Sequence, residues 1–362
     1  MPESEICRRG CRTVMNGTIA LLLTQDGVTS GAIYALIALA ILIVFTVTRV
    51  ILVPQGQFVT YGALTYGLMQ SGVMPGTAWL LFISSGLAGI LDARVAITAG
   101  RSRDLLLIAA IRIVFPVLVL AVSLSIAPEK LGTAGQIALT LATVVPLGPL
   151  MYRLVFEPIA DASVLMLLIV AVAVDVALSG IGLLLFGSEG ARTDPLFDVT
   201  LSLGPAQLGA PTLTIVVTSL LLMLMLFLFF ERTILGRALR ATAIHRLGAR
   251  LVGIPVRRAG QLSFLLASLL GAVSGVLVSS VMTVYYDSGF MIGLKGFVAA
   301  IVGGLVSYPI AVLGALIIGL IEAWSAFYAS AFKEVIVFTA LIPVLIVRSF
   351  LARETPEEEV DE

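Results

Sequence analysis

Residues that could carry chemistry are scarce in this sequence. It has one histidine, His245, and two cysteines, Cys7 and Cys11, which are too few for a tetrahedral metal site or a disulfide framework. Its three lysines do not stand in the glycine-rich frame of a phosphate-binding loop, and neither HExxH nor GxSxG occurs. We therefore expect no catalytic residue, no metal, no cofactor and no ATPase site within the chain.

The densest basic segment runs from residue 231 to residue 258 and is too polar to enter a bilayer. On a helix, Leu239, Thr242 and Arg246 fall at three- and four-residue spacings and form one mixed face, which Gly253 would end. Two interpretations stay open. The segment is either a basic anchor lying on the inner leaflet, or a short helix that docks in a groove of a partner protein.

Neutral polar side chains gather near the start of the chain and could line a path for a solute. They suit a zwitterion or an uncharged amide, since transit requires weak binding; the alternative is that the glutamines cap an irregular turn. Two adjacent glycines interrupt a later apolar run, where the backbone would either line a cavity or allow close packing. The candidates for the path are Tyr34, Gln55, Gln57, Tyr61, Gly303 and Gly304.

Three charges fall inside apolar runs, where each is costly: Arg112, Asp175 and Glu322. Asp175 is either a proton or cation ligand, or it pairs with Arg112 or a hydroxyl or faces a subunit interface. The first interpretation would favour an ion- or proton-coupled secondary transporter of a small neutral solute. The sequence leaves this class of transporter open.

The elements that must position these residues follow from composition. Apolar residues make up 59% of the 362 and charged residues 12%, against about 45–50% and about 25% in soluble proteins. The 22 basic and 22 acidic residues cancel, which excludes a nucleic-acid partner. Continuous apolar runs without alternation predict membrane helices. They span residues 27–48, 51–91 (two helices divided near Gly72), 105–126, 131–152, 162–186, 210–230, 261–285, 296–306, 309–328 and 334–350.

These runs predict an all-α polytopic membrane protein with ten to eleven membrane segments, some short or broken. We expect a polar N-terminal tail (1–26), a membrane domain (27–350) and an acidic C-terminal tail (351–362). Because cytoplasmic loops collect arginine, segment 231–258 is placed inside. Alternation then puts the N-terminal tail outside, in conflict with its three arginines. Residues 92–130 look like an insertion, and one added crossing there would explain the conflict.

Five stretches in order resemble the permease subunits of bacterial ABC importers of the branched-chain amino acid type. GAIYALIALA looks like the family's first membrane helix, YRLVFEP resembles its inner loop, and LGRALRA with ARLVGIPV resembles its cytoplasmic coupling loop. The fifth stretch is similar to the C-terminal end of these permeases. In order, they occupy residues 31–40, 152–158, 235–241, 249–256 and 259–324.

The resemblance implies the ABC importer permease fold and a multi-pass subunit in the bacterial plasma (inner) membrane. It implies these partners: a second permease subunit, homologous or identical; two cytoplasmic ATPase subunits; a periplasmic or lipid-anchored substrate-binding protein; and membrane lipid. The solute would be a branched-chain or related neutral amino acid, moved into the cytoplasm. The ATPase-coupling residues would be Gly236, Arg237, Leu239, Arg240, His245, Arg246, Arg250 and Gly253.

Overall fold

The computed structural model describes residues 3–98, 113–125, 130–195, 201–203, 206–305, 307–343 and 345–346. The described residues form helices and their connecting segments, with one small hairpin and one isolated bridge between Ala191 and Val284, so the predicted all-α membrane class is confirmed. Arg112, the middle of the expected insertion and the acidic tail lie outside the described residues. Six described helices are long and apolar enough to cross a membrane: 19–48, 133–159, 164–186, 210–232, 256–278 and 308–328.

The first half of the chain contains α1 (Glu3–Thr48), α2 (Gln55–Gln70), α3 (Thr77–Thr98), α5 (Phe115–Ser125), α6 (Thr133–Val144) and α7 (Leu147–Met151). A π-helical turn, η3 (Tyr152–Phe156), and a 3₁₀ turn, η4 (Glu157–Ile159), then lead to α8 (Val164–Phe186). The apolar run 51–91 divides into α2 and α3 at residues 71–76, as expected. α1 has no break at residue 26, so the residues expected as a tail continue the first membrane helix.

The second half begins with an antiparallel hairpin of β1 (Leu201–Leu203) and β2 (Ala206–Leu208). The helices that follow are α9 (Ala210–Arg232), α10 (Ile234–Ile244), α11 (Arg246–Leu251), α12 (Val256–Val278), α13 (Ser288–Val302), α14 (Tyr308–Tyr328) and α15 (Lys333–Thr339). A 3₁₀ turn, η5 (Ser330–Phe332), separates the last two. Within the expected segment 296–306, residues 296–302 form the end of a longer helix, α13, and residues 303–305 form a turn.

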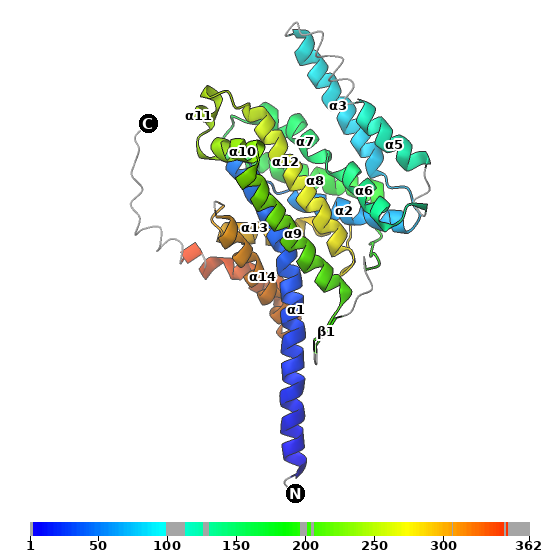
Figure 1. Ribbon diagram of the computed structural model, residues 1–362, viewed down its shortest axis with the longest axis vertical. Helices are drawn as coiled ribbons and strands as arrows, with labels where there is room; N and C mark the ends of the chain where they lie inside the picture. Colours follow the sequence, from blue (N-terminus) through cyan, green and yellow to red (C-terminus); the bar gives the residue numbers. More distant parts are fainter. Residues whose placement is uncertain are drawn as a thin grey trace.

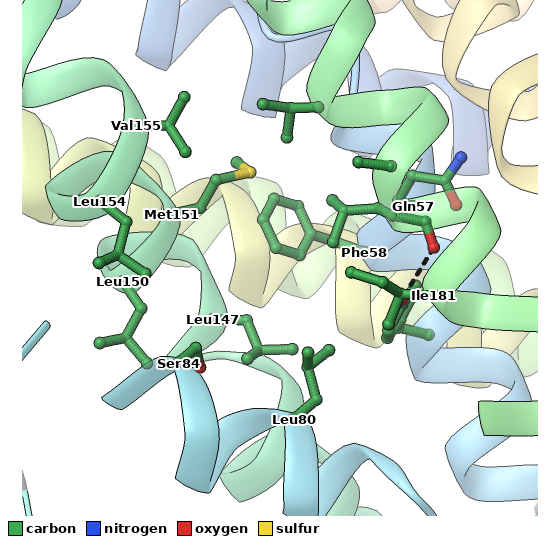
Figure 2. Close-up of a pocket in the computed structure, with 14 residues that line it drawn as sticks. Gln57, Phe58, Leu80, Ser84, Leu147, Leu150, Met151, Leu154, Val155 and Ile181 are labelled. Atoms are coloured by element: carbon green, nitrogen blue, oxygen red, sulfur yellow. Dashed lines mark hydrogen bonds between the residues drawn. The ribbon is translucent and has the colours of Figure 1, made fainter. Parts of the chain in front are cut away.

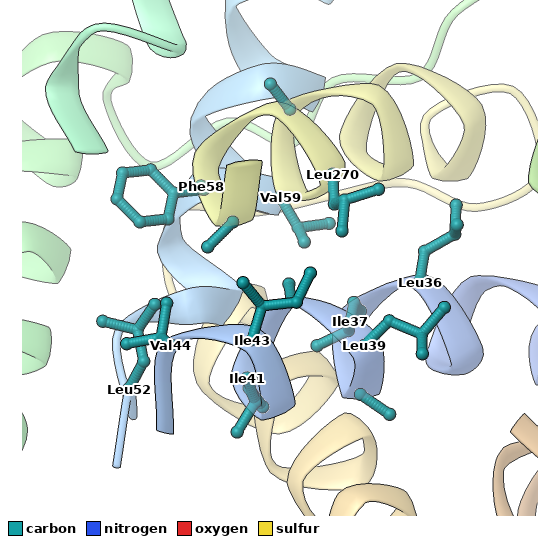
Figure 3. Close-up of a cluster of buried hydrophobic side chains, with 14 of the residues drawn as sticks. Leu36, Ile37, Leu39, Ile41, Ile43, Val44, Leu52, Phe58, Val59 and Leu270 are labelled. Carbon is teal, nitrogen blue, oxygen red and sulfur yellow. The ribbon is translucent and has the colours of Figure 1, made fainter. Parts of the chain in front are cut away.

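The C-terminal half of α1 is the centre of the molecule and packs against α9, α12, α13 and α14. Its residues are apolar on every face, the pattern of a helix buried all round. Leu36, Ile37 and Ile43 are fully buried; Val59 of α2 and Leu270 of α12 point toward α1 (Figure 3), and Ile37 lies against Gly296 of α13. The N-terminal part of α1 extends beyond the other elements (Figure 1).

Glycines let α2 and α12 approach closely. A Cβ added at Gly275 would overlap the carbonyl oxygen of Val59, and one at Gly271 would lie 2.7 Å from the Cβ of Phe58. Without a hydrophobic drive between helices in lipid, such backbone contact supplies the association through van der Waals packing. Gly271 and Gly275 therefore serve the close packing of α12 on α2.

The ends of the helices define two opposite ends of the molecule. α10 and α11 lie at one end together with the C-terminal end of α1, while the N-terminus lies at the other (Figure 1). α9 runs between the two ends. Its 23 residues span about 34 Å at about 1.5 Å per residue. That length matches the roughly 30 Å hydrocarbon core of a bilayer.

Candidate functional site

The basic segment 231–258 folds into two short helices, α10 and α11, that meet at His245. Thr233 caps α10 by accepting a hydrogen bond from the amide of Gly236 (2.9 Å). His245 both ends α10 and caps α11, since its Nδ1 accepts from the amide of Gly248 at 2.7 Å. Gly253 adopts φ +84°, a conformation that favours glycine, and turns the chain into α12. The expected single helix is therefore two helices with a capped joint.

Two residues fix α10 against the membrane helices. Leu239 is 1% exposed and belongs to the main apolar core. Gly236 lies against the end of α9, where an added Cβ would overlap the carbonyl oxygen of Phe229. α10 is therefore packed directly against other helices, which include α1, α9 and α12.

The outer surface of α10 and α11 exposes large apolar side chains beside arginines. Arg237, Arg240 and Arg250 are exposed, with Arg240 donating to Glu231 at 2.8 Å and Arg250 lying 4.0 Å from Asp161. Arg246 is half-buried, and its Nε has no hydrogen-bond partner. We call the exposed apolar set the docking patch: Ile234, Leu235, Ile244, Leu247, Leu251 and Val252, each at least 58% exposed.

An ion-pair cluster ties the start of α12 to α3 and to the turn η3–η4. Arg153, held inward by the π-helical turn, contacts Asp92 at 2.6 Å and Glu157 at 2.7 Å. Arg257 contacts the same carboxylates at 3.2 Å and 2.6 Å. We call these four residues the clamp. It joins α12, which directly follows α11, to the body of the protein.

Gln57 and Tyr61 share an apolar cavity of about 260 Å³ between α2, α3, α7 and α8. Phe58, Leu147 and Met151 point toward one another across it (Figure 2). Gln57 donates to Asp175 at 3.1 Å, and the hydroxyl of Tyr61 donates to the carbonyl of Leu178 at 2.8 Å. Asp175 thus has an amide partner rather than a hydroxyl, while Arg112, the other partner considered from the sequence, lies outside the described residues.

The other path candidates lie elsewhere. Gln55 donates to the carbonyl of Ala267 on α12 at 3.0 Å. Gly303 and Gly304 form the turn between α13 and α14, where Gly304 has φ +68° and a Cβ on Gly303 would lie 2.6 Å from that of Ala311. The structure therefore does not bring the six candidates into one cavity.

Tyr34 belongs to a second, charged cavity of about 620 Å³ that the sequence did not indicate. Its hydroxyl donates to Glu322, which Lys295 contacts at 2.6 Å. Lys333 and Glu334 complete the group. The signal in the sequence is that Lys295 and Lys333, two of only three lysines, flank the helix that contains Glu322.

Comparisons with known proteins agree on one family. Residues 23–347 match the family described as "Branched-chain amino acid transport system / permease component". The high-affinity branched-chain amino acid transport system permease protein LivH of Escherichia coli is 28% identical over 344 residues, which cover 92% of this chain and 95% of LivH. BraD of Pseudomonas aeruginosa, described in the same words, is 31% identical over 214 residues, covering 57% of this chain and 70% of BraD. No solved structure matches.

Proposed function

Because the chain belongs to the family of branched-chain amino acid transport permeases, we propose that it is the membrane-spanning subunit of an ABC importer. It would move branched-chain or related neutral amino acids into the cytoplasm, driven by separate ATPase subunits. The observation that carries this proposal is the pair of short helices α10 and α11, which expose apolar side chains at one end of the molecule.

The docking patch fits a helix-in-groove contact better than a membrane anchor. Leu247 and Leu251 stand four residues apart on one face of α11, as anchors of a helix that lies in a groove do, and Ile244 is exposed at the adjoining end of α10. Arg237, Arg240 and Arg250 stand beside them and would face acidic groups at the rim of such a groove. Rim charges of this kind set register and association rate more than affinity.

The attachment of these helices suits the transmission of a push from outside the membrane. α10 is held to α1 and α9 through Leu239 and Gly236, and the clamp holds the start of α12. A movement of α10 and α11 must therefore reach membrane helices on both sides. A rigid element with two discrete positions is what coupling of ATP hydrolysis to alternating access requires.

Arginine placement supports a cytoplasmic position for this end. Arg153 and Arg257 meet in the clamp, and Arg49 and Arg240 line one cavity beside α10. Under the positive-inside rule this end faces the cytoplasm, and the N-terminus faces outside. A periplasmic or lipid-anchored binding protein would deliver solute to the outer end. A second permease subunit, two ATPase subunits and the bacterial inner membrane complete the proposed assembly.

Two changes in the docking patch test the proposal. Leu247→Asp with Leu251→Asp places charge on side chains that are 63% and 81% exposed, so folding is preserved. We expect the ATPase subunits to be lost on copurification and ATP-driven uptake to fall at least tenfold. The matched control is Val73→Asp, an exposed apolar residue between α2 and α3, which should leave both unchanged. Normal copurification and uptake in the double variant would overturn the docking assignment.

A further inference from the structure

The charged cavity lies at the end of the molecule opposite to α10 and α11. It is lined by α1 from Asp26 to Tyr34, by Thr212 in the first turn of α9, and by α13, α14 and α15. Thr212 and the end of α9 are 20 residues apart, which on a helix is about 30 Å. Under the proposed function, this cavity therefore opens toward the outer side. Its size is within the range of small-molecule sites, about 300–1,000 Å³.

The floor of the cavity is a buried ion pair held in one geometry. Lys295 and Glu322 have side chains that are 7% and 11% exposed, and their charged atoms are 2.6 Å apart. The hydroxyl of Tyr34 donates to the second carboxylate oxygen of Glu322, and its ring lies 5.9 Å from the Lys295 ammonium. Charges placed at membrane depth are costly, and they mark functional positions by default.

Above this floor, a second pair is looser and more open. Lys333 lies 3.4 Å from Glu322 and 3.6 Å from Glu334, and the two side chains are 33% and 44% exposed. Glu334 contacts Lys295 at 3.2 Å through one oxygen, while its other oxygen is buried without a partner. An ammonium with only long contacts is available to a carboxylate that enters the cavity.

The rim of the cavity adds negative charge. Asp26 and Asp287 line it, and neither forms an ion pair with any cation in the described part of the chain. The cavity therefore contains four carboxylates against two ammonium groups, which favours a ligand that brings a positive charge. Val281, Met282 and Met291 supply exposed apolar surface beside these groups.

We infer that this cavity binds the head group of a zwitterionic α-amino acid. Lys333 receives the ligand carboxylate, Asp287 at the rim receives the ligand ammonium, and the apolar side chain lies against Met282 and Met291. The fixed Lys295–Glu322 pair keeps the floor neutral and prevents either ligand charge from being trapped below. This inference rests on the proposed function and names the part of the chain that meets the solute.

The test is ligand binding to the full chain in lipid nanodiscs, measured by calorimetry. The probes are leucine, 4-methylpentanoate, which lacks the ammonium, and isoamylamine, which lacks the carboxylate. We expect leucine to bind at least tenfold more tightly than either analogue. Equal binding of isoamylamine and leucine, or no leucine binding up to millimolar concentrations, would overturn the inference.

Two single variants test recognition of the ligand carboxylate and of the ligand ammonium separately. Lys333→Gln should lower the affinity for leucine and for 4-methylpentanoate at least tenfold and leave the affinity for isoamylamine unchanged. Asp287→Asn should lower the affinity for leucine and for isoamylamine and leave the affinity for 4-methylpentanoate unchanged. The matched control is Lys130→Gln, an exposed lysine outside the cavity. Loss of binding of all three ligands in either variant would contradict the assignment, provided that the unfolding temperature of the chain without ligand is unchanged.

ATP-driven leucine uptake by the assembled transporter distinguishes failure of this inference from failure of the proposed function. If uptake is normal but leucine binds no more tightly than the two analogues, the solute binds elsewhere in the same importer. Uptake that needs no ATPase subunits would reject the importer itself. If both proposals hold, Lys333→Gln and Asp287→Asn each lower uptake while the ATPase subunits still copurify.

Discussion

Removal of Arg153 from the clamp should destabilise the protein far more than removal of Arg257. Arg153 and Asp92 are each 10% exposed and lie 2.6 Å apart, whereas Arg257 is 47% exposed. Loss of one partner of a buried pair costs about 3–5 kcal/mol, since a charge is left in a poor solvent. In Arg153→Met, Arg257 would still contact both carboxylates. We therefore expect the free energy of unfolding to fall by about 3 kcal/mol, near the low end of that range.

The matched variant is Arg257→Met, which removes the exposed partner of the same carboxylates. Water and Arg153 continue to solvate these carboxylates, and an exposed pair contributes about 1 kcal/mol or less. The difference between the two variants is therefore about 2 kcal/mol, or about 30-fold in the folding equilibrium. Unfolding of the purified chain by SDS titration in mixed micelles measures it.

Transport separates the structural and coupling roles of the clamp. Arg257→Met should keep its stability and its ATPase subunits but lower the uptake obtained per ATP hydrolysed, because α12 is held less firmly beside α11. Equal destabilisation by the two variants would refute the argument from burial. Unchanged uptake per ATP in Arg257→Met would refute the coupling role of the clamp.

Further variants address the helix attachments and the alternative function. Leu239→Ala should lower the free energy of unfolding by about 2–5 kcal/mol in the same titration, because it opens a cavity where α10 meets the core; no change would contradict this anchor. Gly275→Ala should lower thermal stability because its Cβ overlaps the α2 backbone, whereas Gly86→Ala, with nothing within 4 Å, should be neutral or stabilising. Equal effects of these two would reject the close-packing argument. Asp175→Asn still accepts a hydrogen bond from Gln57, so ATP-driven uptake should persist; its loss would favour an ion-coupled transporter.

Hydropathy was sufficient to place most of the helices. Five of the six helices that can span a membrane begin within five residues of the predicted start, because an uninterrupted apolar run is a local property. The exception is the first helix, which starts before residue 27 although Gln25 and Asp26 are polar. The apolar residues around these positions continue the helix, and isolated polar side chains do not end one.

Local sequence patterns could not predict the contacts that form the clamp and the two cavities. Asp92 and Arg257 are 165 residues apart, and Gln57 and Asp175 are 118 apart, so only the fold brings them together. The charged cavity was missed for the same reason. Lys295 and Lys333 stand just outside the predicted membrane runs, whereas both contact Glu322 inside the fold.

Uptake in proteoliposomes tests the central claim most directly. Vesicles that contain this chain with its ATPase subunits and binding protein should take up leucine only when ATP is supplied on the ATPase side. Vesicles that contain this chain alone should show no uptake under an imposed proton or sodium gradient. Gradient-driven uptake by the chain alone would contradict the account.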